Sequence, residues 1–123
     1  MINNYPIINI YEKKNVNSKI SSQILYGEEF TIKKKFKNWF KIRTNKDKYL
    51  GYIKNRKFFK NLKTTHKVAS LKAAIYRKPH KGSKTKRYLS FASKIRVLKK
   101  KNKFSKFENF WVQNKDIVKK NKK

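Results

Sequence analysis

The stretch WFKIR at residues 39–43, followed by YLGYI at residues 49–53, decides the fold. In the first segment Phe40 and Ile42 alternate with residues of the opposite face, which is the two-residue period of a β-strand with one buried side. The second segment has the same character, and Gly51 marks a point where the backbone bends or another segment approaches closely. The intervening TNKDK is typical of a turn. The two segments therefore predict a β-hairpin.

Short apolar runs continue on both sides of this hairpin, and none has the period of a long helix. They lie at residues 7–10, 24–26 and 30–32 before it, and at residues 68–75, 89–91, 95–98 and 104–112 after it. Short strands at even spacing with turns between them favour small barrels over a helical bundle. We therefore expect an all-β chain with domains at residues 10–57 and 66–118, a lysine-rich linker at residues 54–65 and a basic tail at residues 119–123.

Four blocks of the first half resemble the bacterial SH3 domain. They are ILYGE at residues 24–28, FTI at residues 30–32, WFKIR at residues 39–43 and DKYLGYI at residues 47–53. The second half resembles the second SH3-like domain of the NlpC-type bacterial dipeptidyl-peptidases, through HKV at 66–68, IYRKP at 75–79, LSF at 89–91, IRV at 95–97 and WV at 111–112. The resemblance implies two tandem small SH3-like barrels.

In that family the SH3 domains precede a papain-like domain whose triad is a cysteine and two histidines. This sequence contains no Cys, so His66 and His80 have no nucleophile to serve. The resemblance implies a non-catalytic module that helps to bind or wall a muropeptide, truncated or split from its peptidase domain. The partners it implies are an NlpC-type peptidase domain, encoded in the same gene or a split gene, and a muropeptide or peptidoglycan peptide.

Four residues are candidates for binding such a substrate. Glu28 could accept a hydrogen bond from the free amine of a muropeptide, although a solvated acid paired with surplus lysines is the alternative. Trp39 could line a recognition groove or fill the barrel core. Tyr49 and Tyr52 differ by three positions in a strand and so point to opposite faces, with Tyr49 expected to be the exposed one. We expect Glu28, Trp39 and Tyr49 to share one groove.

The charge of the chain has two explanations. A formal net charge of +30, from 36 Lys+Arg against 6 Asp+Glu, suits a nucleic acid or another anionic surface. The alternative function is therefore a lysine-rich SH3-like nucleic-acid-binding protein. However, only five of the basic residues are Arg, and Lys, Asn and Ile all have A/T-rich codons, so compositional drift in a low-GC genome explains the same bias. Drift predicts only weak, non-specific nucleic-acid binding, largely lost by about 0.2 M salt.

Several classes of function are disfavoured by the sequence. An enzyme in its own right would need an active site assembled from six acids and two histidines, so we expect no activity. His66 and His80 have no ligand partners at metal-binding spacing, and we expect no metal or cofactor. Residues 1–11 lack the basic start and apolar core of a signal peptide, and no stretch is long enough to span a membrane. Together with the absence of Cys, this predicts a cytoplasmic protein.

Overall fold

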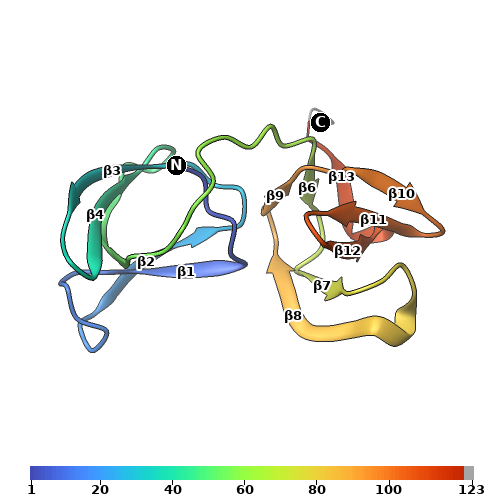
Figure 1. Ribbon diagram of the computed structural model, residues 1–123, viewed down its shortest axis with the longest axis horizontal. Coiled ribbons are helices and arrows are strands. Elements are labelled where there is room, and N and C mark those ends of the chain that lie inside the picture. Colours follow the sequence, from blue (N-terminus) through green and yellow to red (C-terminus); the bar gives the residue numbers. More distant parts are fainter. Residues whose placement is uncertain (121–123) are drawn as a thin grey trace.

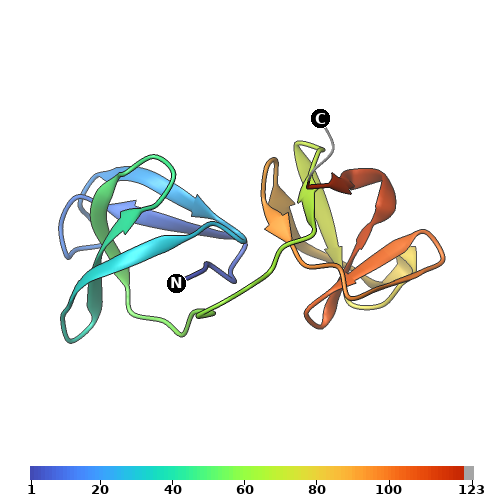
Figure 2. The ribbon, with the colours of Figure 1, turned by 90° about the horizontal axis from the view of Figure 1, so that it is seen from above.

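The computed structural model describes residues 1–120 and shows a chain built almost wholly from β-strands. Two small barrels lie side by side and are joined by an extended segment, drawn in green in Figure 1. Figure 2 shows this segment passing from one barrel to the other, and residues 55–65 contain no helix. The prediction of an all-β chain with two tandem SH3-like barrels is confirmed.

The first barrel is a five-stranded antiparallel sheet in the order β2-β1-β5-β4-β3. Its strands are β1 (Ile7–Tyr11), β2 (Ile20–Leu25), β3 (Phe30–Lys35), β4 (Trp39–Thr44) and β5 (Leu50–Lys54). Strands β4 and β5 form the predicted hairpin, with Phe40 opposite Ile53. The turn between them is closed by Thr44, whose Oγ1 accepts a hydrogen bond from the backbone N–H of Tyr49 at 2.9 Å.

Alternate residues of these strands form one apolar core, as the two-residue period requires. Its buried members are Ile8, Ile10, Ile24, Phe30, Phe40, Ile42 and Ile53. Gly51 lies where another segment approaches, because a Cβ built there would stand 2.3 Å from Cγ2 of Ile10. The close approach predicted at this glycine is therefore present.

The first barrel extends beyond both predicted ends of its domain. Ile2 forms β-bridges to Glu29 and to Phe59, which ties the N-terminus and the start of the linker to the barrel. Phe58 packs against this core, with its ring centroid 4.9 Å from that of Phe30. The segment predicted as a linker from residue 54 thus begins as part of the barrel, because its aromatic residues complete the core.

The second barrel contains eight short strands. They are β6 (His66–Val68), β7 (Lys72–Tyr76), β8 (Lys84–Ser90), β9 (Lys94–Ile95), β10 (Lys99–Lys101), β11 (Phe104–Phe107), β12 (Phe110–Gln113) and β13 (Ile117–Lys119), with single 3₁₀ turns η1 (Lys81–Ser83) and η2 (Asn114–Asp116). They form two sheets, ordered β10-β11-β12-β7-β8 and β13-β6-β9. Both sheets contribute to one core, which includes Val68, Leu89 and Val112.

The C-terminal residues belong to this barrel as far as the structure describes them. Lys119 ends β13, and the backbone N–H of Lys120 donates to the carbonyl of Thr65 at 2.9 Å. The predicted basic tail therefore begins within the sheet. Its remaining part, residues 121–123, lies outside the described residues.

Candidate functional site at the junction of the two barrels

The turn between β2 and β3 (residues 25–28), which we call the junction turn, faces the second barrel. The side chain of Glu28 closes it, because Oε1 accepts a hydrogen bond from the backbone N–H of Leu25 at 2.7 Å. Gly27 adopts a φ of +82°, and a Cβ there would lie 2.0 Å from the carbonyl oxygen of Lys94. Only glycine fits both the left-handed backbone and this contact between barrels.

Tyr26 is the main anchor of this junction. Its side chain is only 2% exposed and belongs to the core of the second barrel, where its ring packs edge-on against Phe107 at 5.5 Å between centroids. The phenol donates a 2.5 Å hydrogen bond to Oε2 of Glu108, and the backbone carbonyl of Tyr26 accepts one from the N–H of Lys94 at 2.8 Å. A residue of one barrel thus completes the core of the other.

Burial and the neighbouring carboxylate of Glu108 fix the protonation state of this tyrosine. Burial, followed by the hydrogen bond to Glu108 and the charge of that carboxylate, raises the pKa of Tyr26 well above its usual range. The phenol is therefore a neutral hydrogen-bond donor throughout the physiological pH range.

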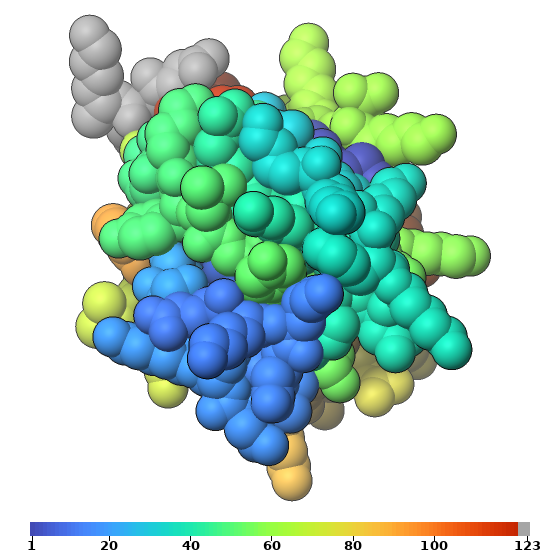
Figure 3. Space-filling view, turned by 90° about the vertical axis from the view of Figure 1, so that its left-hand side faces the viewer, coloured from blue at the N-terminus to red at the C-terminus, as the bar shows by residue number. Residues whose placement is uncertain are grey.

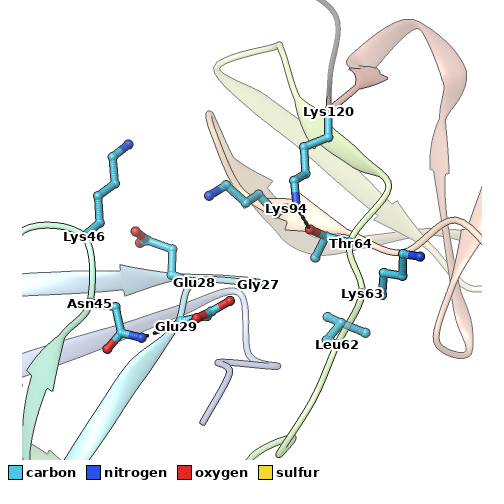
Figure 4. Close-up of a pocket in the computed structure, with 10 residues that line it drawn as sticks. All are labelled: Gly27, Glu28, Glu29, Asn45, Lys46, Leu62, Lys63, Thr64, Lys94 and Lys120. Carbon is cyan, nitrogen blue, oxygen red and sulfur yellow. Dashed lines mark hydrogen bonds between the residues drawn. The ribbon is translucent and has the colours of Figure 1, made fainter.

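A cavity of about 360 Å³ lies beside the junction turn, and we call it the junction cavity. The first barrel lines it with Gly27, Glu28, Glu29, Asn45 and Lys46, and the linker and second barrel line it with Leu62, Lys63, Thr64, Lys94 and Lys120. Figure 4 shows the carboxylates on one side and the ammonium group of Lys94 extending toward them from the other barrel. The first-barrel side therefore carries two carboxylates together with Lys46, and the opposite side carries lysines.

Hydrogen bonds orient several of these groups. Oε2 of Glu29 accepts from the side-chain amide of Asn45 at 3.3 Å, and Nζ of Lys120 donates to Oγ1 of Thr64 at 3.0 Å. Because Oε1 of Glu28 is engaged by Leu25, a ligand in the cavity would meet Oε2 of that carboxylate. Glu28 is half-buried, so its charge is partly shielded from water.

The four sequence-predicted binding residues do not share one groove. Glu28 lines the junction cavity, whereas Trp39 begins β4 at the opposite end of the barrel. The six residues of β4 span about 17 Å between these ends. Tyr49 is 48% exposed and lies beside the β4–β5 turn, at the same end as Glu28. The expectation of one groove shared by Glu28, Trp39 and Tyr49 is therefore corrected by the strand direction.

Trp39 and Tyr52 both lie on the outer face of the first barrel. Trp39 packs edge-on against Tyr11 with 5.7 Å between ring centroids, so it is not a core residue. Tyr52 is half-buried next to Phe36 at 6.2 Å. Tyr49 is the more exposed of the two tyrosines, as predicted. However, the two do not divide between the core and the surface, because Tyr52 also lies outside the core. The reason is that Tyr49 lies outside β5, and within β5 it is Gly51 and Ile53 that face inward.

Sequence reasoning missed Tyr26 and Lys94. Tyr26 precedes Gly27 in a turn, and a large aromatic residue beside a turn glycine was the one available signal of a docking contact. Lys94 gave no signal, because its backbone bond to Tyr26 does not depend on residue type and its side chain is one of many lysines.

Within residues 1–120, no group of three or more His, Asp or Glu side chains could hold a metal ion. Burial, helped by Lys100 and Lys119, lowers the pKa of His66. No helix in the same residues is long and apolar enough to cross a bilayer.

Comparison with protein families identifies the first barrel. Residues 10–58 match the bacterial dipeptidyl-peptidase SH3 domain. The match contains the junction turn and all four candidate residues, and it confirms the resemblance of the first half to this family. It ends before β6, so the resemblance of residues 66–117 to a second domain of the same proteins stays a prediction. No curated protein matched the chain.

Proposed function

We propose that this chain is a binding module for short cell-wall peptides, and that the junction cavity receives the free amino end of the peptide. The observation that carries the proposal is the paired charge of the cavity, with Glu28 and Glu29 on the first barrel and Lys94 on the second. The match of residues 10–58 to a peptidase-associated SH3 domain supports the same role.

A muropeptide suits this charge pattern. Such a peptide carries a free terminal amino group and several carboxylates, so it needs an acidic and a basic group in one cavity. Oε2 of Glu28 would accept a charge-assisted hydrogen bond from the ammonium group, and Lys94 would pair with a carboxylate. Tyr49, exposed on the adjacent hairpin, would supply a flat wall to a small side chain.

An NlpC-type peptidase domain is the partner that we propose for this surface. The cavity is open and polar, and it offers a peptide only part of an enclosure, so affinity of the chain alone should be near millimolar, or about −4 kcal/mol. A catalytic domain placed over Glu28 and Tyr49 would complete the enclosure. The role of Trp39 and Tyr52 is separate, because they lie away from this cavity.

Binding of a tripeptide that begins L-Ala-γ-D-Glu tests the amine contact. In an NMR titration, Glu28→Gln should weaken binding by about tenfold, the loss of one charge-assisted bond at about 1.4 kcal/mol. The matched control is Glu12→Gln, which removes the same charge from the opposite end of the barrel. N-acetylation of the peptide should weaken binding to the unaltered chain equally. Equal binding of acetylated and free peptide would show that the cavity does not recognise the amine.

A cleavage assay tests the partner. An NlpC-type peptidase domain without its own SH3 domains should cleave the tripeptide faster when this chain is added. Glu28→Gln and Tyr49→Ala should each reduce the gain, whereas Glu12→Gln should not. If the chain leaves the cleavage rate unchanged, the proposed role beside a peptidase is wrong.

A further inference from the structure

The end of the first barrel that points away from the second barrel carries a cluster of aromatic rings. Tyr11, Trp39 and Tyr52 are outward-facing residues of three adjacent strands, and Phe36 lies in the β3–β4 turn beside them. Ring centroids are 5.7 Å apart for Tyr11–Trp39 and 6.2 Å apart for Phe36–Tyr52. All four side chains are half-buried, so each keeps part of its ring in solvent. We call this surface the distal face.

Lysines surround these rings. Nζ of Lys14 lies 3.8 Å from the ring centroid of Phe36, and Nζ of Lys34 lies 5.2 Å from it. Lys41 pairs with Lys34 on one side and with Tyr52 on the other, and Lys54 pairs with Trp39. These lysines concentrate positive charge on the same face as the rings.

Acidic residues are almost absent from this end of the barrel. Glu12 is the only acid in the segments that form it, whereas Glu28, Glu29 and Asp47 occupy turns at the opposite end. Figure 3 views the distal end, where residues 11–19, in blue, lie beside the teal and green atoms of the β3–β5 strands. The distal face therefore presents positive charge and ring surface together.

Trp39 also lines a hollow in this surface. The hollow has a volume of about 520 Å³, and its other walls are Val16, Asn38, Lys54 and Asn55. The side-chain amides of Asn38 and Asn55 carry both donors and acceptors, and both residues are exposed. A flat polar ring could stack on Trp39 there and meet an amide at its edge.

We infer that the distal face binds single-stranded nucleic acid, with lysines on the phosphates and Trp39 stacked on a base. Such sites in small barrels combine aromatic residues on a sheet face with basic residues around them. A polyanion without bases would use the lysines but not the rings, and a neutral glycan would use the rings but not the lysines. A chain of phosphates and bases uses both. This site is separate from the junction cavity, so a failure of nucleic-acid binding would not contradict peptide binding, and the reverse also holds.

Intrinsic fluorescence gives a direct test with the 123-residue chain and an oligo-dT of twelve nucleotides. Trp111 is 6% exposed within the second barrel, so quenching on titration should come from Trp39. By anisotropy of a fluorescein-labelled oligo-dT, Trp39→Leu should weaken binding by about tenfold, and Trp39→Phe by less. The aromatic control is Phe91→Leu, because Phe91 is 56% exposed on the second barrel. Circular dichroism and melting of each variant separate lost binding from lost folding.

The lysines are tested by salt dependence. The double variant Lys34→Gln/Lys41→Gln should lower the slope of log K against log salt by about 1.4, or about 0.7 for each lost phosphate contact. The control Lys100→Gln/Lys101→Gln removes the same charge from β10 and should lower the slope less. An equal loss of salt slope in both double variants would overturn the inference. So would competition by inorganic polyphosphate as strong as that by oligo-dT, together with no effect of Trp39→Leu, because only diffuse charge attraction would then remain.

Discussion

The two ends of the first barrel have opposite surfaces, although each strand runs from one to the other. At the junction end, the turn of residues 25–28 is acidic and buries Tyr26 in the neighbouring barrel. At the distal end, half-buried rings lie among lysines with one acid nearby. The same five-stranded scaffold therefore provides an assembly contact at one end and an open surface at the other.

This difference shows how a chain of net charge +30 can hold two basic barrels together. Lysines on both barrels repel each other, and this repulsion opposes docking. The junction relies on groups that are insensitive to it: a buried ring, a neutral phenol bonded to Glu108 and a backbone hydrogen bond from Lys94 to Tyr26. The acids near the junction further reduce the local repulsion.

Removal of the Tyr26 ring should destabilise the junction of the two barrels most severely. Tyr26→Ala leaves a cavity in the second core and deletes the bond to Glu108, so the free energy of unfolding should fall by about 3–5 kcal/mol. Urea denaturation followed by circular dichroism measures it. The control is Tyr49→Ala at an exposed site, which should change stability by less than about 0.5 kcal/mol. Equal losses in the two variants would show that Tyr26 is not the anchor.

A methyl group at Gly27 should strain the contact between the barrels without removing any core side chain. Gly27→Ala places Cβ against the backbone of Lys94 and requires a left-handed φ, so we expect a loss of about 1–3 kcal/mol. Amide chemical shifts around Lys94 should move. Gly82→Ala is the matched control, since its nearest atoms belong to the His80 side chain at 3.3 Å or more. Similar changes of amide chemical shift around Lys94 in both variants would contradict the close contact between Gly27 and Lys94.

Much of the fold could be predicted because its signals are patterns within short stretches of sequence. Alternation in WFKIR gave the inward and outward faces of β4, and Gly51 gave the point of close approach. The extent of the first barrel was not predictable, because Ile2 and Phe58 join it through bridges and packing between residues far apart in sequence. Charge and turn composition carry no information about such contacts.

The candidate site was less accessible to sequence reasoning. Glu28 was found from its unusual charge, and Trp39 from its size, but their separation along β4 depends on strand direction. The second wall of the junction cavity comes from Lys94 and the linker, which reach it only when the two barrels dock. A contact between two domains produces no periodic pattern in the sequence of either domain.

The Tyr26 hydroxyl alone should have an intermediate effect, with a distinctive pH dependence. Tyr26→Phe removes a hydrogen bond to a carboxylate, which should cost about 1.5 kcal/mol near pH 7. Because the pKa of Tyr26 is raised in the folded state, its ionisation favours the unfolded chain. The advantage of the unaltered chain over the variant is complete below about pH 10, the usual tyrosine pKa, and should shrink by about 1.4 kcal/mol per pH unit above it. A difference that stays constant from pH 8 to pH 11 would contradict the buried, neutral phenol.

The smallest expected effect distinguishes the structural role of Glu28 from its proposed binding role. Glu28→Ala removes the acceptor for the Leu25 N–H in a partly buried turn, so the free energy of unfolding should fall by about 1 kcal/mol. Glu28→Gln keeps an amide oxygen at that position, so it should lower the free energy of unfolding by less than about 0.5 kcal/mol. The same variant removes the charge on which peptide binding is proposed to depend. Glu12→Ala, at the distal end, should leave stability almost unchanged. The comparison is made by urea denaturation of the three variants beside the peptide titration. If Glu28→Gln destabilises the chain as much as Glu28→Ala, the carboxylate charge supports the turn itself, and a loss of peptide binding in that variant would no longer identify a ligand contact.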